Sequence, residues 1–405
     1  MNTLSKRLRR QTDQSDDGSL KESVSKLTAE PTSPTCVTKE KLIRRSNILV
    51  CKVVAQGYLS QDCPVFFPDH DIYRSLKKSL VTSDDLKFLG KCLQLGVTAV
   101  GINFCESASD VEYIKKIVGN KARGLDFIAR IKTLKGLQNI RQIIDASDGI
   151  QFCRGSLSLE MDFTNISFAF QHVLRLCKMS ARFFQLPTQI HESTMKGSVP
   201  MLAQVNDITS NIFDGIDSLM LSVETAKGDF YKESVKSVKY IIEEAERRID
   251  FPKRYMEQQI LLADAFQARI KLKQLEPQQK TEYAWSIDEC MASCAVKASF
   301  DVNAKLIVVL TTDGHAAFRI LSHSPKCTIV AAPASLEAAN KLTLRKGIYP
   351  LLVGSMHGHS RLLEYVIEQV LKAKFVNIGD TIVLASGNSS QGNIFNHLLK
   401  IITIE

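Results

Sequence analysis

Residues 219–249 read LMLSVETAKGDFYKESVKSVKYIIEEAERRI, and this stretch decides the fold. It opens with a three-residue apolar run, 219–221, which is too short for a helix and is typical of a buried parallel strand. A loop of small residues follows at 222–228. The next apolar residues have helical spacing and predict an amphipathic helix: Val235, Val238, Ile241, Ile242 and Ala245. A strand, a loop and a helix form one βα unit, and ligands of such folds bind in the loop after the strand.

The same period runs through the sequence that precedes this stretch, from Asp84 onward. Short apolar runs alternate with helical patterns, which indicates a parallel sheet covered by helices. The predicted strands are 99–103, 126–131, 149–153, 182–185 and 219–221. We therefore predict five βα-type strands, whereas a closed (β/α) barrel needs about eight.

The rest of the chain divides by composition. Residues 1–44 are polar and nearly free of aromatic residues, so we predict a disordered tail. We assign 45–80, with a strand at 47–54, to the entry of the fold, 81–250 to the partial barrel and 251–283 to a helical connector. A second α/β alternation follows in 284–405, with strands predicted at 306–310, 328–331, 350–353, 381–385 and 399–404.

The bulk composition is that of a soluble globular protein. The 405 residues are 44% hydrophobic and 23% charged, and the net charge of +9 is dispersed, which does not favour a nucleic-acid partner. The ten cysteines form no CxxC pair, so a zinc site is not predicted. No apolar run is long enough to span a membrane. Residues 1–11 have the basic composition of a mitochondrial targeting segment, but the acids that follow favour a cytoplasmic location.

The motif LMLSVETAKGDF at 219–230 closely resembles the last barrel unit of pyruvate kinases. The resemblance extends from about Lys52 to the C-terminus. It implies an α/β fold, namely a partial (β/α)8 TIM-type barrel with about five of eight βα units, followed by a pyruvate-kinase-type α/β C-terminal domain. The five strands then correspond to barrel strands four to eight, and 45–80 to a remnant of the small β-domain. Strands one to three and most of that β-domain have no counterpart in the sequence.

The resemblance also locates candidate site residues at the ends of the barrel strands. The family's fifth-strand motif, Lys-Ile-Glu, is Arg130-Ile131-Lys132 here, so Arg130 replaces the catalytic lysine and Lys132 replaces a metal-binding glutamate. The sixth-strand motif Arg-Gly-Asp becomes Arg154-Gly155-Ser156, which removes the second metal carboxylate. Arg154, Gly155, Ser156 and Thr188 are the candidate substrate-binding residues, and no metal ligand is predicted.

Three functions follow from this pattern. We expect a pyruvate kinase-like protein that is catalytically inactive by itself and acts as a binding or regulatory partner, in a homo- or hetero-oligomer with pyruvate kinase family subunits. The alternative is an active pyruvate kinase of glycolysis, which would transfer phosphate from phosphoenolpyruvate to ADP with Mg²⁺ and K⁺. The third is a sensor of a small phosphorylated or carboxylate ligand, since arginines and a turn can hold an anion without metal.

The remaining motifs are interpreted as structural. Glu224 and Lys227 lie in the loop of the last barrel unit and are expected to stabilise it. The turn 311–316 and the loop 385–392 occupy the places where effector-regulated relatives bind a sugar bisphosphate. Asp313 would repel a phosphate there, so an ordinary turn and loop are expected.

Overall fold

The computed structural model describes residues 43–45, 48–50, 81–119, 124–274, 286–354, 359–386 and 398–405. The chain forms two compact units, Met1–Lys77 and Lys78–Glu405. In the first unit, β1 (Ile43–Arg45) pairs antiparallel with β2 (Ile48–Val50). The strand predicted at 47–54 is described only over β2, and the predicted tail lies outside the described residues except at its end, where 43 and 44 belong to β1.

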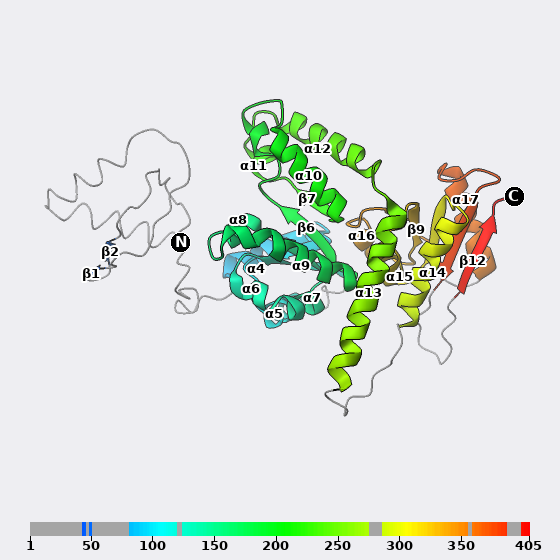
Figure 1. Cartoon of the computed structure of the whole chain (residues 1–405), viewed down its shortest axis with the longest axis horizontal. Helices are drawn as coiled ribbons and strands as arrows, with labels where there is room; N and C mark the ends of the chain where they lie inside the picture. Colours follow the sequence, from blue (N-terminus) through cyan, green and yellow to red (C-terminus); the bar gives the residue numbers. More distant parts are fainter. Residues whose placement is uncertain are drawn as a thin grey trace. The chain divides into compact units, whose positions relative to one another are not determined.

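The second unit begins with the predicted parallel sheet, which is confirmed as five strands in the order β3-β4-β5-β6-β7. All neighbouring pairs are parallel. The strands are β3 (Ala99–Ile102), β4 (Asp126–Ile131), β5 (Gly149–Phe152), β6 (Phe183–Pro187) and β7 (Ser218–Met220). The sheet is curled, as expected for part of a barrel, and its carboxyl ends form one edge (Figure 1).

Helices follow these strands along the chain. The longer ones are α4 (Ser83–Gln94), α5 (Ala108–Val118), α7 (Ile140–Ala146), α9 (Ile166–Met179), α10 (Leu202–Asp214) and α12 (Tyr231–Glu246). The short ones are α6 (Leu134–Gln138), α8 (Arg154–Leu157) and α11 (Val223–Ala226), with 3-10 turns at Phe163–Asn165 and Glu192–Met195. The first turn of α10 buries no side chain, and the buried residues of this helix begin at Ile208.

The core of this half-barrel lies between the middle strands and their helices. Phe152 of β5, Phe184 of β6 and Phe170 of α9 form an aromatic cluster, with ring centroids 5.5 to 6.4 Å apart. Each is at most 5% exposed, and full burial of such a side chain contributes roughly 1.5–3 kcal/mol. This cluster holds β5 and β6 in place and so fixes the loops at their ends.

The deciding stretch is less buried than predicted. Strand β7 is only partly buried along its whole length, because β6 is its one partner among the described strands. Val235 was predicted to face the core, but it is 50% exposed. Helix α12 instead buries Val238, Ile241 and Ala245, and it packs chiefly on α10. Its inward face is therefore narrower than the apolar pattern indicated.

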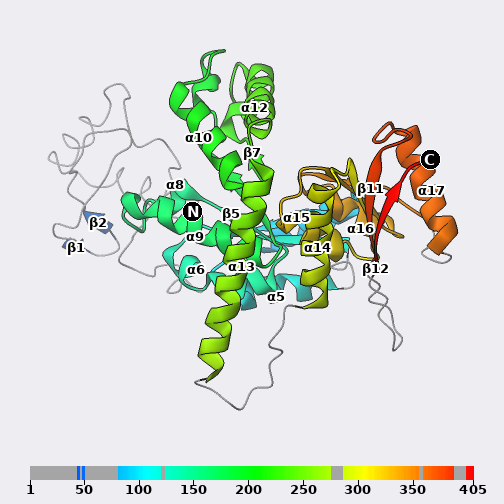
Figure 2. The ribbon, with the colours of Figure 1, turned by 45° about the vertical axis from the view of Figure 1, so that its right-hand side comes forward.

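A 24-residue helix, α13 (Phe251–Gln274), follows α12 and precedes the C-terminal sheet (Figure 2). That sheet has the order β10-β9-β8-β11-β12, in which only β12 is antiparallel to its neighbour. Its strands are β8 (Leu306–Leu310), β9 (Thr328–Ala332), β10 (Ile348–Pro350), β11 (Thr381–Ser386) and β12 (Leu398–Thr403). Its helices are α14 (Ile287–Asp301), α15 (His315–Ser322), α16 (Leu336–Leu342) and α17 (His359–Lys372).

Both faces of the C-terminal sheet are covered. Along β8, Ile307 and Val309 belong to the core shared with α14 and α15, whereas Leu306 and Val308 belong to the core shared with α17. Figures 1 and 2 show α14 and α17 on opposite sides of the sheet. The predicted strand at 350–353 was placed two residues too late, because β10 pairs with β9 from Ile348 onward.

Candidate functional site

The carboxyl edge of the barrel sheet gathers the site residues that the sequence singled out. Arg130 and Lys132 lie at the end of β4, the 154–156 turn follows β5, and Thr188 follows β6. Because β4, β5 and β6 are adjacent and parallel, these residues share one edge of the sheet. The fold thus brings together segments that are up to 58 residues apart in sequence, from Arg130 to Thr188.

Two cations dominate the end of β4. The Lys132 ammonium lies 4.6 Å from the ring centroid of Phe104, a cation–π contact that holds the side chain in place. Burial and the neighbouring Arg130 guanidinium both lower the pKa of Lys132. The Arg130 Nε is buried and has no hydrogen-bond partner among the described residues. This corner of the edge therefore carries positive charge that is not fully used by the protein.

Cys153 lies beside this pair of cations. Burial raises the pKa of its thiol, and the charges of Arg130 and Lys132 only partly offset that effect. A protonated, buried thiol is a poor nucleophile and a poor metal ligand. Within the described parts of the chain, no group of three or more His, Cys, Asp or Glu side chains could hold a metal ion.

A row of polar side chains crosses the barrel sheet at the level of Arg130. Arg130, Gln151 and Gln185 are cross-strand partners on β4, β5 and β6, and Ser218 continues the row on β7. The Gln151 Nε2 donates to the Gln185 Oε1, and the Gln185 Nε2 donates to the Ser218 Oγ at 3.0 Å. The sequence analysis missed this row. Its signal was one polar residue at the same register position in each of four neighbouring strands.

Arg154, a predicted substrate-binding residue, is already paired. Its two Nη atoms donate to the two carboxylate oxygens of Asp207, each at 2.8 Å, and Nη2 also donates to the Gln189 carbonyl at 3.3 Å. Two parallel bonds of this kind fix the guanidinium plane. Asp207 lies on α10 and was not singled out from the sequence, because it is 53 residues from Arg154 along the chain.

The turn after β5 is also largely satisfied by the protein. The backbone N–H groups of Ser156 and Leu157 both donate to the Cys153 carbonyl, at 3.2 Å. Gly155 packs closely against the Gln189 amide, because a Cβ at Gly155 would lie 2.9 Å from its Oε1. A side chain at this position would displace the Gln189 amide. The turn is therefore held against the loop after β6.

That loop has a strained backbone. Thr188 and Gln189 have φ angles of 60° and 54°, in the left-handed region that β-branched residues rarely adopt. Such conformations cost roughly 1–2 kcal/mol per residue. The Thr188 hydroxyl donates to the Pro187 carbonyl at 2.7 Å, so in this conformation it points back to its own strand. Strain of this kind is retained where the surrounding contacts determine the backbone.

Glu224 makes the main contacts that hold the backbone of the loop after β6. Its carboxylate is fully buried and accepts the N–H groups of Ser222 at 2.7 Å, His191 at 3.1 Å and Ile190 at 3.3 Å. Burial opposes ionisation, but these donors outweigh it and lower the pKa of Glu224. The carboxylate joins the loop after β6 to the loop after β7, which agrees with the structural role expected for Glu224.

The C-terminal turn is an ordinary helix start. The Thr311 hydroxyl accepts the Gly314 N–H at 3.0 Å, and the Asp313 carboxylate accepts the His315 N–H at 3.0 Å. Thr311 is buried, so its hydroxyl serves the turn. The second predicted effector element, the loop 385–392, lies outside the described residues beyond Ser386.

Fold and site together define a class: a two-domain α/β protein in which a curled parallel sheet, with polar residues along its carboxyl edge, precedes a second α/β sheet. Comparison with known families gives the family. Residues 37–235 match the family model "Pyruvate kinase, barrel domain", and residues 289–402 match "Pyruvate kinase, alpha/beta domain". The chain belongs to the pyruvate kinase family.

Individual relatives agree with this assignment. A pyruvate kinase of Dictyostelium discoideum is 29% identical over 372 residues, which are 92% of this chain and 68% of the relative. A pyruvate kinase of Eimeria tenella is 29% identical over 313 residues, or 77% of this chain. The match spans only 55% of that relative's length. The crystal structure of a pyruvate kinase from Cryptosporidium parvum has the same fold, with a TM-score of 0.72 and 23% identity, over 89% of this chain and 70% of that one.

Proposed function

We propose that this pyruvate kinase family member does not catalyse by itself and acts as a binding or regulatory partner, including of active pyruvate kinase subunits. One observation carries the proposal. The end of β4 presents the cations Arg130 and Lys132 where the family resemblance implies a catalytic lysine and a metal-binding glutamate. Ser156 stands where the second metal carboxylate is implied.

The donor set does not fit Mg²⁺. That ion requires oxygen ligands in near-octahedral geometry, and carboxylates supply the charge that holds it. The Lys132 ammonium is fixed on Phe104 and lies beside Arg130, so a dication would meet two positive charges instead of a carboxylate. An active family member would use Mg²⁺ and K⁺ by the same resemblance, but no catalytic step through a metal follows from these residues.

A coupled pyruvate kinase assay tests the proposal directly. The unmodified chain and the double variant Lys132→Glu/Ser156→Asp are compared with phosphoenolpyruvate, ADP, Mg²⁺ and K⁺. We expect no turnover from the unmodified chain. Clear turnover would overturn the proposal and establish the alternative, an active pyruvate kinase.

Metal binding provides a second readout that does not depend on turnover. The electron paramagnetic resonance signal of free Mn²⁺ falls when the ion binds protein. We expect the unmodified chain to leave the signal unchanged and the double variant to reduce it, because two carboxylates are restored at adjacent strand ends. The variant Lys132→Met/Ser156→Ala is the matched control, which removes the ammonium without adding ligands. Mn²⁺ binding by the unmodified chain would contradict the argument from charge.

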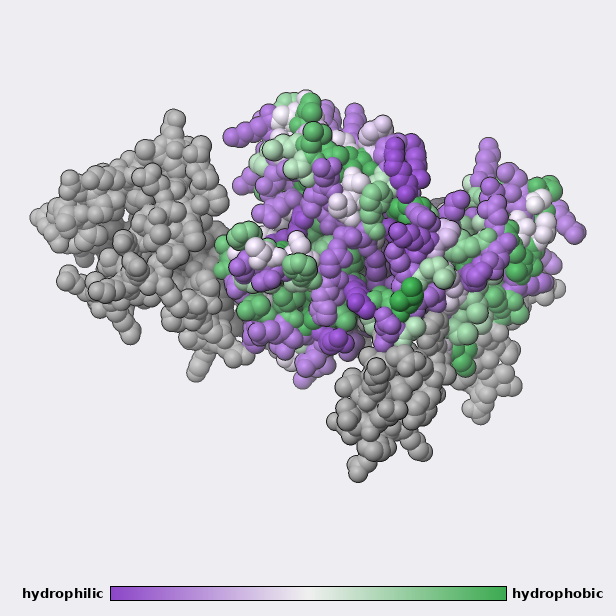
Figure 3. Space-filling model, in the orientation of Figure 1, coloured by the Kyte–Doolittle hydropathy of each residue, from purple (hydrophilic) through white to green (hydrophobic). Residues whose placement is uncertain are grey.

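The partner role is supported by exposed apolar side chains on the barrel flank. Met201, at the start of α10, and Leu202 within it are 61% and 80% exposed, and Val235 and Tyr240 of α12 are 50% and 66% exposed. Apolar atoms are visible among polar ones over these helices (Figure 3). We expect co-expressed pyruvate kinase subunits to co-purify with this chain, and Leu202→Glu/Val235→Glu to weaken that association. Absence of any association would exclude the partner role.

A small-anion sensor is the second candidate, favoured by the unpartnered Nε of Arg130 and the ammonium of Lys132. A millimolar phosphoenolpyruvate titration followed by melting temperature tests it, with Arg130→Met as the variant that should abolish the shift.

No helix in the described part of the chain is both long and apolar enough to cross a bilayer.

A further inference from the structure

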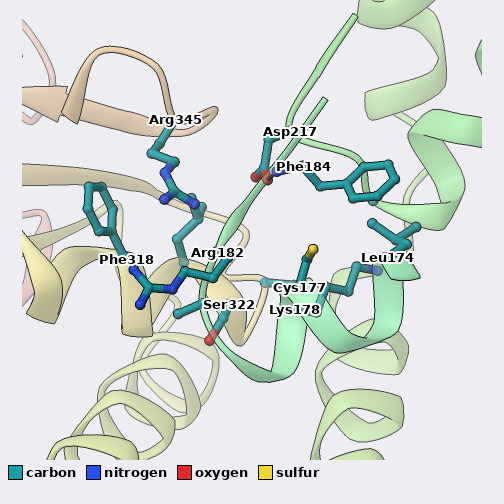
Figure 4. Close-up of a pocket in the computed structure, with 13 residues that line it drawn as sticks. Leu174, Cys177, Lys178, Arg182, Phe184, Asp217, Phe318, Ser322 and Arg345 are labelled. Atoms are coloured by element: carbon teal, nitrogen blue, oxygen red, sulfur yellow. Dashed lines mark hydrogen bonds between the residues drawn. The ribbon is translucent and has the colours of Figure 1, made fainter. Parts of the chain in front are cut away.

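A second concentration of charge lies at the opposite, amino-terminal edge of the barrel sheet, where the C-terminal domain packs against it. A cavity of about 50 Å³ opens there. Its charged lining residues are Lys178, Arg182 and Asp217 from the barrel and Arg345 from the C-terminal domain. Figure 4 shows Arg345, Phe318 and Arg182 on one side of this cavity, Lys178 and Leu174 on the other, and Asp217 above it.

Arg345 is the central group. Its side chain is 6% exposed, and its guanidinium carbon lies 4.3 Å from the ring centroid of Phe318 and 5.4 Å from that of Phe183. These two rings fix the guanidinium without satisfying its donors. Among the described residues its one hydrogen bond is long, from Nη2 to the Asp148 carbonyl at 3.3 Å, and its buried Nε has no partner there. A buried cation with an unpaired N–H requires an acceptor.

Arg182 has donors available as well. Its closest charged partner is the Asp148 carboxylate at 3.8 Å, and its Nη2 reaches the Asp145 carbonyl only at 3.4 Å. Both contacts are at the limit of useful geometry. The Arg182 side chain, which lines the cavity, is 25% exposed. Two arginines therefore line one space, and each has hydrogen-bonding capacity that the protein does not use.

The surrounding acids do not neutralise this space. Asp126 pairs with Lys341 at 3.3 Å, and one Asp217 oxygen accepts the Phe184 N–H at 2.7 Å. No ion pair within 4 Å joins Asp217 to Arg345 in the described structure, although both line the cavity. Asp126, Asp148 and Asp217 all lie close enough to act on the Arg345 charge, but none of them forms an ion pair within 4 Å with it in the described structure.

We propose that this seam between the barrel and the C-terminal domain is a binding site for a small inorganic oxyanion of the size of phosphate, held by Arg345 and Arg182. The cavity volume of about 50 Å³ fits an ion of this size, because it is several times the roughly 10–15 Å³ needed to hold one water molecule. It is too small for a nucleotide or a sugar phosphate. Two guanidinium groups match a tetrahedral oxyanion in geometry and charge. The bound ion joins the two domains, because each contributes one arginine.

Thermal unfolding of the full chain with inorganic phosphate, against chloride at equal ionic strength, tests the site. A ligand that binds only the folded state raises the melting temperature, here by about 3 °C at saturating phosphate. We expect Arg345→Met and Arg182→Gln each to weaken phosphate binding about tenfold or more, measured by calorimetric titration. If Arg345→Met does not fold, Arg182→Gln decides, because Arg182 is partly exposed.

Two control variants test whether the phosphate effect comes from this site or from other cationic side chains. Lys346 is adjacent to Arg345 and also joins the two domains, through an ion pair with Glu246 at 2.6 Å, but it does not line the cavity. Lys346→Met should therefore retain the phosphate effect, and so should Arg130→Met at the opposite edge of the sheet. No phosphate effect in the unmodified chain would overturn the proposal. An effect that survives Arg182→Gln, or is lost in Arg130→Met, would overturn it too.

Discussion

The two ends of the barrel strands differ in what holds their polar groups. At the carboxyl end, polar groups are satisfied by side chains of the barrel itself: Arg154 by Asp207, and three backbone N–H groups by Glu224. At the amino end, charges of the barrel meet charges of the C-terminal domain, as in the contact of Lys341 with Asp126. The family's chemistry is implied for the first end, yet each end holds one buried arginine Nε without a partner in the described structure, Arg130 at the first and Arg345 at the second.

This difference teaches that a retained fold and a retained site are separate properties. The carboxyl end keeps its strand ends, its strained Thr188 turn and its buried Glu224, whereas the resemblance implies that Lys132 and Ser156 stand where the family has metal ligands. At the amino end, burial lowers the pKa of Lys178 and raises that of Asp217. Three predictions test whether the two ends differ in this way.

The largest effect is expected at Glu224. Glu224→Ala should lower the free energy of unfolding by about 3 kcal/mol, because three buried N–H groups lose their acceptor. Urea unfolding measures it. Lys227→Ala, in the same loop, is the control and should change stability by less than about 0.5 kcal/mol. Equal effects of the two variants would show that the carboxyl end does not depend on the Glu224 carboxylate.

A pH effect is expected at the amino end. Burial, and then the nearby Arg254, lowers the pKa of Lys178 from 10.5 to about 8. Between these two values the unfolded chain binds more protons at this group than the folded chain, so stability should rise with pH from about 8 to 10.5. We expect Lys178→Met to remove about 2 kcal/mol of this rise. Parallel stability–pH curves for the two proteins would refute the assignment.

The smallest effect is expected at the Arg154–Asp207 pair. Its side chains are 23% and 36% exposed, so water screens the interaction. Asp207→Asn should lower the free energy of unfolding by about 1 kcal/mol or less. A double-mutant cycle with Arg154→Met measures the coupling. A coupling well above 1 kcal/mol would mean that this pair is a major support of the carboxyl end and would narrow the contrast between the two ends.

Several features could be predicted from the sequence because they depend on local order. The period of apolar runs gave all five barrel strands within two residues, and it gave the C-terminal alternation. The errors occurred where a neighbour decides the outcome. Val235 has the right spacing for the core, but α12 packs chiefly on α10 and leaves it exposed.

The sequence by itself determined the βα period and the family motif at 219–230, because residue identity and spacing along the chain are sufficient for these. Through the resemblance it also implied that Lys132 and Ser156 stand where the family has metal carboxylates. Only the tertiary structure showed that the Asp207 carboxylate accepts two hydrogen bonds from Arg154, and that Arg345 lines a cavity together with Arg182. Arg182 and Arg345 are separated by 163 residues, and only the packing of two domains brings their charges into one buried space, where low dielectric makes their contacts matter.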